Sequence, residues 1–261
     1  LAMLDEIVST KQQEVEDAKQ RLPFEDLKAR LRSHLAERDF RKAIHVPGKL
    51  SLIAELKRKS PSKGMLRERF DPVHLAQTLQ EAGAAALSVL TDEAYFGGHL
   101  DFLRDAKQFT EIPALRKDFI VDPYQVYEAA AYEADAVLLI VCILTDEVLV
   151  ACMQAADTLG VEPFVEVHSE SELKIALSMG ARVIGINHRD LRTFQIDPTL
   201  SEKLIPKIPA GKIIVAESGI QRAEEIQRMK RLGAHAVLIG EALMTAPDPA
   251  AKIRELFSTT W

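Results

Sequence analysis

The sequence predicts an α/β protein, a single (β/α)8 TIM barrel with an N-terminal helical extension. From Ser51 onward, eight apolar runs alternate with helical patterns, and such alternation is typical of βαβ units around a parallel sheet. The regular spacing of the eight units favours a closed barrel over an open, doubly wound sheet. The length of 261 residues fits one barrel, which needs about 250 residues.

We expect one domain over residues 1–261, with the helical extension over 1–48 and the barrel over 49–261. Apolar residues at helical spacing run over 4–35, interrupted at Pro23. No strand precedes this segment, so we expect it to cover the floor of the barrel or to flank its mouth. The expected strands are 51–57, 85–90, 112–117, 136–141, 162–167, 182–187, 213–217 and 236–240. The expected helices are 71–82, 99–109, 122–133, 145–159, 169–179, 199–204, 221–232 and 247–257.

The residues at the helix ends agree with these boundaries. Asp71-Pro72 and Asp122-Pro123 have the form of an N-cap followed by proline at the first helical position. Glycines stand just past four of the helices, where a left-handed cap is needed; they are Gly83, Gly160, Gly180 and Gly233.

Composition narrows the classes of partner. The formal net charge is -6, and an acidic chain argues against nucleic acid. The short basic run Lys57-Arg58-Lys59 at a strand end favours a small anionic substrate instead. Cys142 and Cys152 provide neither a disulfide framework nor metal-ligand spacing. We expect both to be small buried residues of a protein in the reducing cytosol.

We expect no membrane association and a cytoplasmic location. No apolar run reaches the length of a membrane span, and the first residues are too charged for a secretory signal. We also expect a monomer, because no heptad seam is visible.

Charged residues close the first strand. Alternation places Glu55 and Lys57 on one face and Leu52, Ala54 and Leu56 on the other. In an antiparallel sheet the charged face would meet water. In a parallel sheet covered by helices neither face is wet, so this face must point into the barrel near its top. Buried charges cost several kcal/mol unless they are paired, which points to a functional role.

Lys117 and Glu166 occupy similar strand ends. Burial, or the nearby Lys57, can lower the pKa of Lys117, which would suit a general acid. The alternative is a surface lysine paired with Asp118. Glu166 is a candidate acid or base opposite the lysines, and its alternative is a structural role. His168 lies next to it, but the histidines show no metal-binding spacing, so we expect no metal.

The remaining strand ends suggest substrate contacts. Asn187 and Arg189 close the sixth strand and could bind and order a substrate, or could form an ordinary loop network. Gly219 and Gly240 lie at the turns after strands seven and eight, where barrels often bind phosphate through backbone N–H groups. The loop 60–64 is basic and contains glycine, and we weigh a mobile lid against an ordinary exposed loop.

Together these motifs resemble the indole-3-glycerol-phosphate synthase family over essentially the whole chain. They are AELKRKSPSKG (54–64), SVLTDEAYFGG (88–98), LRKDFI (115–120), FVEVH (164–168), GINHRDL (185–191), VAESGI (215–220) and LIGEALM (238–244). The resemblance implies that 1-(2-carboxyphenylamino)-1-deoxyribulose 5-phosphate is converted to indole-3-glycerol phosphate. Carbon dioxide and water are lost, without a metal or organic cofactor, in tryptophan biosynthesis.

The resemblance also implies roles for individual residues. Lys117 matches the general acid, Lys57 a lysine near the substrate carboxylate that also takes part in dehydration, and Glu166 a base or a stabiliser of positive charge. Glu55 and Asn187 match residues that position the substrate and tune the lysines. Further substrate contacts match Ser60, Pro61, Phe119, Leu138, Arg189, Glu217 and Ser218, and the phosphate contacts match Gly219, Gly240 and Glu241.

Two positions depart from the family pattern. His188 stands where asparagine or serine is expected, and alternation points it away from the face of Asn187. Glu241 replaces the serine of some relatives, and its carboxylate would repel a phosphate unless it turned outward.

Three other functions compete. An aldolase-like barrel would form a Schiff base through Lys117 or Lys57. A phosphoribosylanthranilate isomerase would need a Cys/Asp pair, which we do not find at the strand ends. A non-catalytic scaffold would be expected to have lost some of the charged residues, yet all of them are present.

Overall fold

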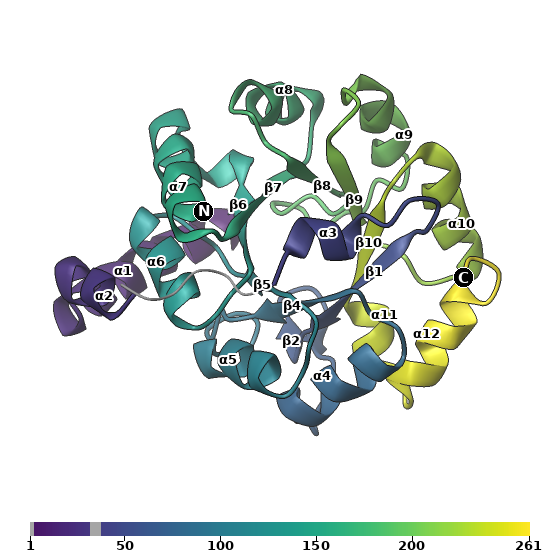
Figure 1. The fold of residues 1–261 in the computed structure, drawn as a ribbon, viewed down its shortest axis with the longest axis horizontal. Coiled ribbons are helices and arrows are strands. Elements are labelled where there is room, and N and C mark those ends of the chain that lie inside the picture. Colours follow the sequence, from purple (N-terminus) through teal and green to yellow (C-terminus); the bar gives the residue numbers. More distant parts are fainter. Residues whose placement is uncertain (1–2, 32–37) are drawn as a thin grey trace.

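The computed structural model describes residues 3–31 and 38–261 and contains a closed parallel barrel (Figure 1). Around the ring the strand order is β1-β10-β9-β8-β7-β6-β5-β4. The strands are β1 (Ser51–Leu56), β4 (Ala86–Leu90), β5 (Ala114–Lys117), β6 (Ala136–Ile140), β7 (Glu162–Val167), β8 (Val183–Asn187), β9 (Ile213–Glu217) and β10 (Ala236–Ile239). The predicted fold class is confirmed, and each strand lies within two residues of its expected bounds.

Helices form the outer ring of the barrel (Figure 1). They are α4 (Pro72–Glu81), α5 (Leu100–Gln108), α6 (Pro123–Ala131), α7 (Asp146–Leu159), α8 (Glu170–Ser178), α9 (Leu200–Leu204), α10 (Ala223–Leu232) and α12 (Pro249–Phe257). The short elements η1 (Val141–Ile143), η2 (Ile205–Lys207) and α11 (Glu241–Met244) were not expected from the sequence. Within residues 3–31 and 38–261, no helix has the length and apolar character needed to cross a membrane.

The helix ends behave as their residues predict. Asp71 and Asp122 cap α4 and α6, accepting hydrogen bonds from the backbone N–H groups of His74 and Tyr124, and proline follows each cap. The glycines expected after helices all have positive φ; they are Gly83, Gly160, Gly180 and Gly233.

Alternation along the strands builds two apolar layers. Leu52, Ala54 and Leu56 of β1 belong to the layer between the barrel and its helices. Ile53 points into the barrel, where it joins a second layer that includes the fully buried ring of Phe164. Burying one such large side chain contributes roughly 1.5–3 kcal/mol. The polar face predicted for β1 is therefore an interior face, and its charged residues lie inside the barrel.

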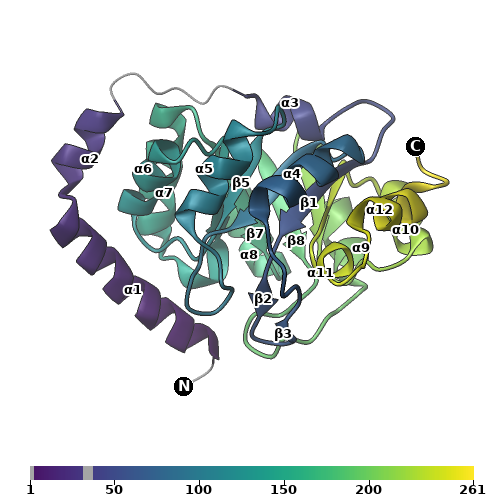
Figure 2. The same ribbon diagram turned by 90° about the horizontal axis from the view of Figure 1, so that it is seen from below.

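The described residues before β1 form three helices, α1 (Met3–Arg21), α2 (Phe24–Arg30) and α3 (Phe40–Ile44). Pro23 separates the first two, as predicted; residues 32–35 of the expected helical stripe lie outside the described residues. Figure 2 shows α3 at one end of the barrel and α1 running along its side toward the opposite end. We expected the N-terminal segment to contact either the floor of the barrel or its mouth. It contacts both ends, since α3 lies at the floor and α1 reaches the mouth. The division at residues 48 and 49 stays a prediction.

A two-stranded hairpin rises from the mouth. It consists of β2 (Lys59–Ser60) and β3 (Gly64–Met65), which pair antiparallel, with Ser60 opposite Gly64. Figure 2 places it at the end of the barrel opposite α3. The loop after β1, expected to be either a lid or an ordinary loop, therefore carries regular backbone pairing.

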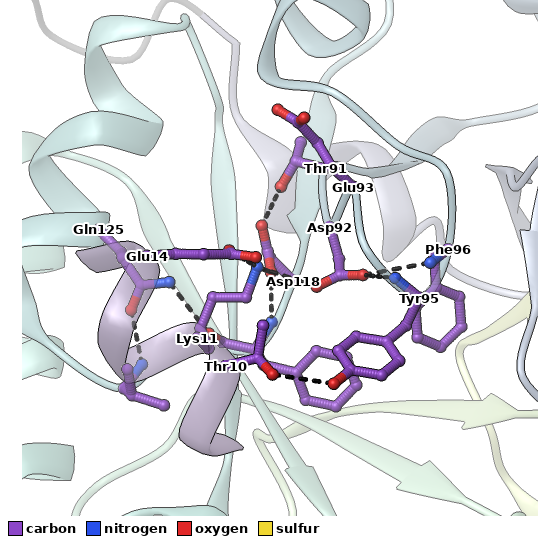
Figure 3. Close-up of polar contacts among 12 residues, drawn as sticks. Thr10, Lys11, Glu14, Thr91, Asp92, Glu93, Tyr95, Phe96, Asp118 and Gln125 are labelled. Atoms are coloured by element: carbon purple, nitrogen blue, oxygen red, sulfur yellow. Dashed lines mark hydrogen bonds and ion pairs between the residues drawn. The ribbon is translucent and has the colours of Figure 1, made fainter. Parts of the chain in front are cut away.

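Lys11 fixes α1 against the mouth (Figure 3). Its Nζ lies 2.9 Å from Asp92 Oδ2 and 3.1 Å from Asp118 Oδ1, and its side chain is only 4% exposed. The two aspartates follow β4 and β5, so one lysine joins the N-terminal helix to two loops of the mouth. Burial alone would lower the pKa of Lys11, but Asp118 and Asp92 outweigh it and raise the pKa.

We predict that Lys11→Met lowers the free energy of unfolding by about 3 kcal/mol, because it leaves two buried carboxylates without their shared cation. Urea unfolding followed by circular dichroism measures the change. Lys28→Met is the matched control: it removes an exposed ion pair with Glu25, worth about 0–1 kcal/mol. Equal losses in the two variants would show that the cluster does not hold α1 in place.

Candidate active site

One pocket opens at the carboxyl ends of the barrel strands, and every site residue expected from the sequence lines it. These residues are Glu55, Lys57, Ser60, Pro61, Lys117, Phe119, Leu138, Glu166, Asn187, Arg189, Glu217, Ser218, Gly219, Gly240 and Glu241. The structure therefore brings the expected set together in space, whereas the role of each residue stays a prediction.

Glu55 connects the two lysines. Its Oε1 lies 3.2 Å from Lys57 Nζ and its Oε2 lies 3.2 Å from Lys117 Nζ. Ser88 Oγ, which the sequence analysis did not single out, donates a hydrogen bond of 2.9 Å to Oε2. Burial would raise the pKa of Glu55, but Lys117 and Lys57 outweigh it and lower the pKa. The alternative of a solvent-facing Glu/Lys pair is wrong, because Glu55 is only 2% exposed.

Gly240 makes space for this carboxylate. A Cβ atom at position 240 would lie 2.6 Å from Glu55 Oε1, closer than real contacts allow. A Cβ at Gly185 would similarly collide with Glu217 Oε1. Glycine within β8 and directly after β10 thus permits two carboxylates to occupy the interior.

The structure corrects the expected pKa of Lys117. Burial does favour a lower pKa, but the carboxylates of Glu55, Glu217 and Glu166 outweigh it, so the pKa is raised. Lys117 is therefore a firmly held cation. The alternative pairing with Asp118 is also wrong, because that carboxylate faces Lys11 and Arg116.

Glu166 is held through one of its oxygens. Asn187 Nδ2 donates to Oε1 at 3.0 Å, and His168 Nε2 lies 3.2 Å from the same atom. Oε2 is buried and has no hydrogen-bond partner among the described residues. Burial would raise the pKa of Glu166, but His168, Lys117 and Asn187 together lower it to about 2. Glu166 therefore presents an ionised oxygen in the pocket.

Glu217 has the opposite character. Burial and repulsion by Glu166 raise its pKa well above the ordinary value, although Lys117 Nζ lies 3.8 Å away. Neighbouring carboxyls with pKa values pushed apart divide into a proton donor and a proton acceptor. The pocket thus offers Glu217 as the protonated carboxyl and Glu166 as the carboxylate.

The turn after β9 is strained. Ser218 has a φ of 68°, which is uncommon for a residue other than glycine, and Gly219 follows with a φ of 76°. Ser218 Oγ donates to Asn187 Oδ1 at 2.7 Å. His188 secures the same turn from outside: its Nδ1 lies 3.0 Å from Ser218 O and its Nε2 lies 2.6 Å from Ser201 Oγ on α9. His188 thus points away from the pocket, as alternation predicted.

The carboxylate of Glu241 is paired with cations. Arg189 Nη2 donates to Glu241 Oε2 at 3.4 Å, and Lys63 Nζ on the hairpin loop lies 3.8 Å from Oε1. Arg189 Nη1 also donates to Phe194 O at 3.3 Å. These contacts neutralise the charge expected to repel a phosphate and join the hairpin side of the mouth to the turn after β10.

Apolar side chains form one wall of the pocket. Phe119 and Leu138 line it as expected, and Phe96 joins them with its ring centroid 5.9 Å from that of Phe119. Phe96 lies within the motif at 88–98, but its sequence context predicts no role for it. Its position depends on the loop after β4 folding back over the mouth, which local periodicity does not report.

One group of residues has the composition of a metal site. Cys142, His168 and Glu172 bring potential ligand atoms within 4.8 Å of one another. Both ring nitrogens of His168 face carboxylates, however, at 3.2 Å in Glu166 and 3.1 Å in Glu172. Burial alone would lower the pKa of His168, but Cys142 and these two carboxylates raise it to about 12. Cys142 is only partly buried, contrary to expectation, whereas Cys152 is fully buried.

The fold and the pocket define a class: a TIM-barrel enzyme with its ionisable residues at the carboxyl ends of the strands. Among solved structures, 3-hexulose-6-phosphate synthase from Salmonella typhimurium matches with a TM-score of 0.65 and 15% identity, covering 80% of this chain and 97% of that chain. Thiamine phosphate pyrophosphorylase from Pyrococcus furiosus matches with a TM-score of 0.62 and 20% identity, covering 81% and 95%. Similarity at these identities concerns the fold alone.

Sequence relatives identify the particular family. The model of the indole-3-glycerol phosphate synthase family matches residues 4–256. Proteins named indole-3-glycerol phosphate synthase from Roseiflexus castenholzii and Dehalococcoides mccartyi strain CBDB1 are 45% and 47% identical to this chain. The alignments cover 97% of this chain in both cases, and 97% and 99% of the relatives. The chain belongs to the indole-3-glycerol phosphate synthase family, which confirms the resemblance and the predicted enzyme class, a carboxy-lyase of tryptophan biosynthesis.

We predict that His188→Leu lowers the free energy of unfolding by about 1–3 kcal/mol at neutral pH, because the Ser218 carbonyl and the Ser201 hydroxyl lose a buried partner. Burial lowers the pKa of His188, so the folded protein binds this proton less readily than the unfolded chain. The stability that neutral His188 contributes is present above its pKa in the unfolded chain, about 6.5. This stability is lost as pH falls toward the lower pKa of His188 in the folded protein.

Urea unfolding at several pH values checks this prediction. The difference between the parent and His188→Leu should shrink as pH falls below about 6.5. A difference that is constant with pH would contradict a neutral buried imidazole at this position.

Proposed function

We propose that the pocket carries out the family reaction through the cation of Lys117 and the carboxylate of Glu166. The observation that carries this proposal is the Glu55 bridge, which places two lysines 3.2 Å from one buried carboxylate at the mouth of the barrel. The substrate, 1-(2-carboxyphenylamino)-1-deoxyribulose 5-phosphate, carries a carboxylate and a phosphate, and cationic groups in a water-poor pocket suit both.

In the first proposed step, the ring carbon that bears the carboxylate forms a bond to the ketone carbon. The carbonyl electron pair moves to oxygen, which takes a proton from Lys117. A cation aimed at the oxygen where negative charge develops lowers the barrier to this step. The raised pKa of Lys117 keeps the group cationic when the substrate binds. It also makes the group a weaker acid, but the alkoxide that forms is a stronger base than the lysine amine and still takes its proton.

The two following steps remove carbon dioxide and water. The bond to the carboxyl group breaks and its electron pair restores the aromatic ring. Lys57 then protonates the departing hydroxyl, and Glu166 accepts the proton lost as the indole double bond forms. The ionised state of Glu166 supports its role as the acceptor.

Substrate positioning completes the proposal. We assign the phosphate to the backbone amides of Gly219, Gly240 and Glu241. Gly240 and Glu241 lie at the start of α11, whose first turn leaves backbone N–H groups without partners inside the helix. Phe119 and Leu138 would contact the aromatic ring. Substrate contacts are proposed for Ser60, Pro61, Arg189, Glu217 and Ser218, and Asn187 orients Glu166 through its 3.0 Å hydrogen bond. We also propose a cytoplasmic monomer, because the two cysteines provide no disulfide framework and no heptad seam is visible in the sequence.

We predict that Lys117→Ala lowers kcat by about 10²–10⁴-fold, the usual contribution of a general acid. Indole-product fluorescence measures turnover of the carboxyphenylamino-deoxyribulose phosphate. Lys59→Ala is the matched control, because its Nζ donates to the Ala94 carbonyl rather than to a carboxylate in the pocket. An inactive but folded parent would contradict the proposed reaction, whereas full activity of Lys117→Ala would contradict the assigned acid.

Borohydride treatment with bound substrate separates this reaction from Schiff-base chemistry. The proposed steps form no covalent adduct, so the mass of the chain should stay unchanged. An adduct on Lys117 or Lys57 would support the aldolase-like alternative.

We predict that Glu55→Gln moves the basic limb of the pH profile of kcat/KM to lower pH. Glu55 helps to raise the pKa of Lys117, so the parent keeps its acid protonated through the alkaline range. Without that carboxylate the pKa falls, and activity is lost as pH rises through the new value. Glu241→Gln should leave the basic limb in place, because Glu241 pairs with Arg189 and Lys63. Coincident limbs in the parent and Glu55→Gln would contradict the control of Lys117 by Glu55.

A further inference from the structure

His168 lies behind Glu166, outside the set of residues to which the proposed function gives a role. The two residues are spaced i, i+2, so their side chains leave β7 on the same side. His168 Nε2 lies 3.2 Å from Glu166 Oε1, and its side chain is only 10% exposed.

Glu172, in the first turn of α8, holds His168 from the other side. Its Oε2 accepts a hydrogen bond of 2.7 Å from the backbone N–H of His168 and lies 3.1 Å from the ring Nδ1. One carboxylate thus fixes both the backbone and the ring of His168. Glu172, His168 and Glu166 form a continuous line of alternating charge from α8 into the pocket.

We propose that His168 is a positioning residue for the family reaction. Together with the hydrogen bond from Asn187, the ionic contact of His168 holds Glu166 Oε1, so that the buried Oε2, which has no hydrogen-bond partner among the described residues, is the oxygen left to accept the proton. This inference rests on the proposed role of Glu166 as the proton acceptor.

The geometry gives His168 a task that Asn187 cannot perform alone. The amide of Asn187 donates one hydrogen bond to Oε1 at 3.0 Å but carries no charge. Glu217 also acts on Glu166, and the pKa values of the two carboxyls are pushed apart, lowered in Glu166 and raised in Glu217. The imidazolium supplies a compensating charge that keeps Glu166 ionised next to a second carboxyl.

Among the described residues, several charged and titratable groups surround the pair. Glu166 meets His168 of the same strand end, Lys117 of β5 and Glu217 of β9. His168 meets Glu172 of α8 and Cys142 of η1, and its charge also acts on Asp190 after β8. Within this set, His168 is the cation in contact with Glu166 Oε1. Its removal therefore raises the pKa of Glu166 and frees the carboxylate to rotate.

The test compares His168→Gln with the parent in the indole fluorescence assay across pH. We expect kcat to fall about tenfold or more, which is part of the roughly 10²–10⁴-fold range of acid–base catalysis. KM should change little. The acid limb of the kcat profile should move to higher pH in the variant. Glu166 must be ionised for turnover, and without His168 its pKa lies closer to the ordinary carboxyl value of about 4.3. His74→Gln, the same substitution at an exposed histidine of α4, should keep the parental profile.

Two further variants separate charge from packing. His168→Lys keeps a cation at this position and should return the acid limb toward its parental position. Glu172→Gln removes one of the two anions beside His168, so the imidazolium loses its proton more easily. The basic limb of the kcat profile should therefore lie at lower pH than in the parent. A merely structural role predicts that all three variants lose activity without moving either limb.

Nitrogen-15 NMR of the imidazole groups tests the inference without an assay. Both ring nitrogens of His168 should remain protonated through neutral pH, with the signal assigned by its loss in His168→Gln. A neutral ring at pH 7 would overturn the inference, as would a variant with the parental pH profile. An inactive folded parent would contradict the proposed function instead, and the NMR result would still decide the charge of His168.

Discussion

The mouth of the barrel depends on balancing charges that the fold keeps out of water. Glu55, Glu166 and Glu217 are each at most 2% exposed, and an isolated buried carboxylate costs several kcal/mol. The structure balances them with two lysines, one imidazolium and one added proton. Glu55 is shared between Lys57 and Lys117, Glu166 faces His168, and Glu217 takes the proton. Each ionised group therefore owes its protonation state to charged neighbours, some at the end of its own strand and some on other strands.

The same principle extends beyond the pocket to the N-terminal segment. Lys11 on α1 lies between Asp92 and Asp118, and Asp118 directly follows Lys117 at the end of β5. Asp118 also accepts from Thr91 at 2.6 Å and from Arg116 at 3.2 Å. The loops after β4 and β5 are thus fixed by a buried ionic cluster, and Asp118 of this cluster also lines the pocket. Helix α1 is a part of the mouth, although it precedes the barrel in the chain.

Local patterns in the sequence were enough to predict the barrel and the charged part of its pocket, whereas Phe119, Leu138 and Glu241 were expected only from the family resemblance. Alternation in β1 alone placed Glu55 and Lys57 inside, because both faces of a parallel sheet are covered. The pKa of Lys117 was predicted in the wrong direction, since its value depends on three carboxylates that approach from β1, β7 and β9. The contacts of Phe96 and His168 with the pocket also depend on tertiary packing. The hairpin β2–β3 and the short helix α3 are too brief for periodicity to reveal.

The two departures from the family pattern illustrate how a site tolerates change. Glu241 adds a carboxylate beside the proposed phosphate position, and Arg189 and Lys63 neutralise it at 3.4 and 3.8 Å. His188 places a larger side chain at a strand end, and its ring bridges the strained Ser218 turn to α9. In both cases the new side chain has polar partners outside the reacting centre. A substitution in this mouth is therefore acceptable when it satisfies its own charge and hydrogen bonds without drawing on Glu55, Glu166 or Lys117.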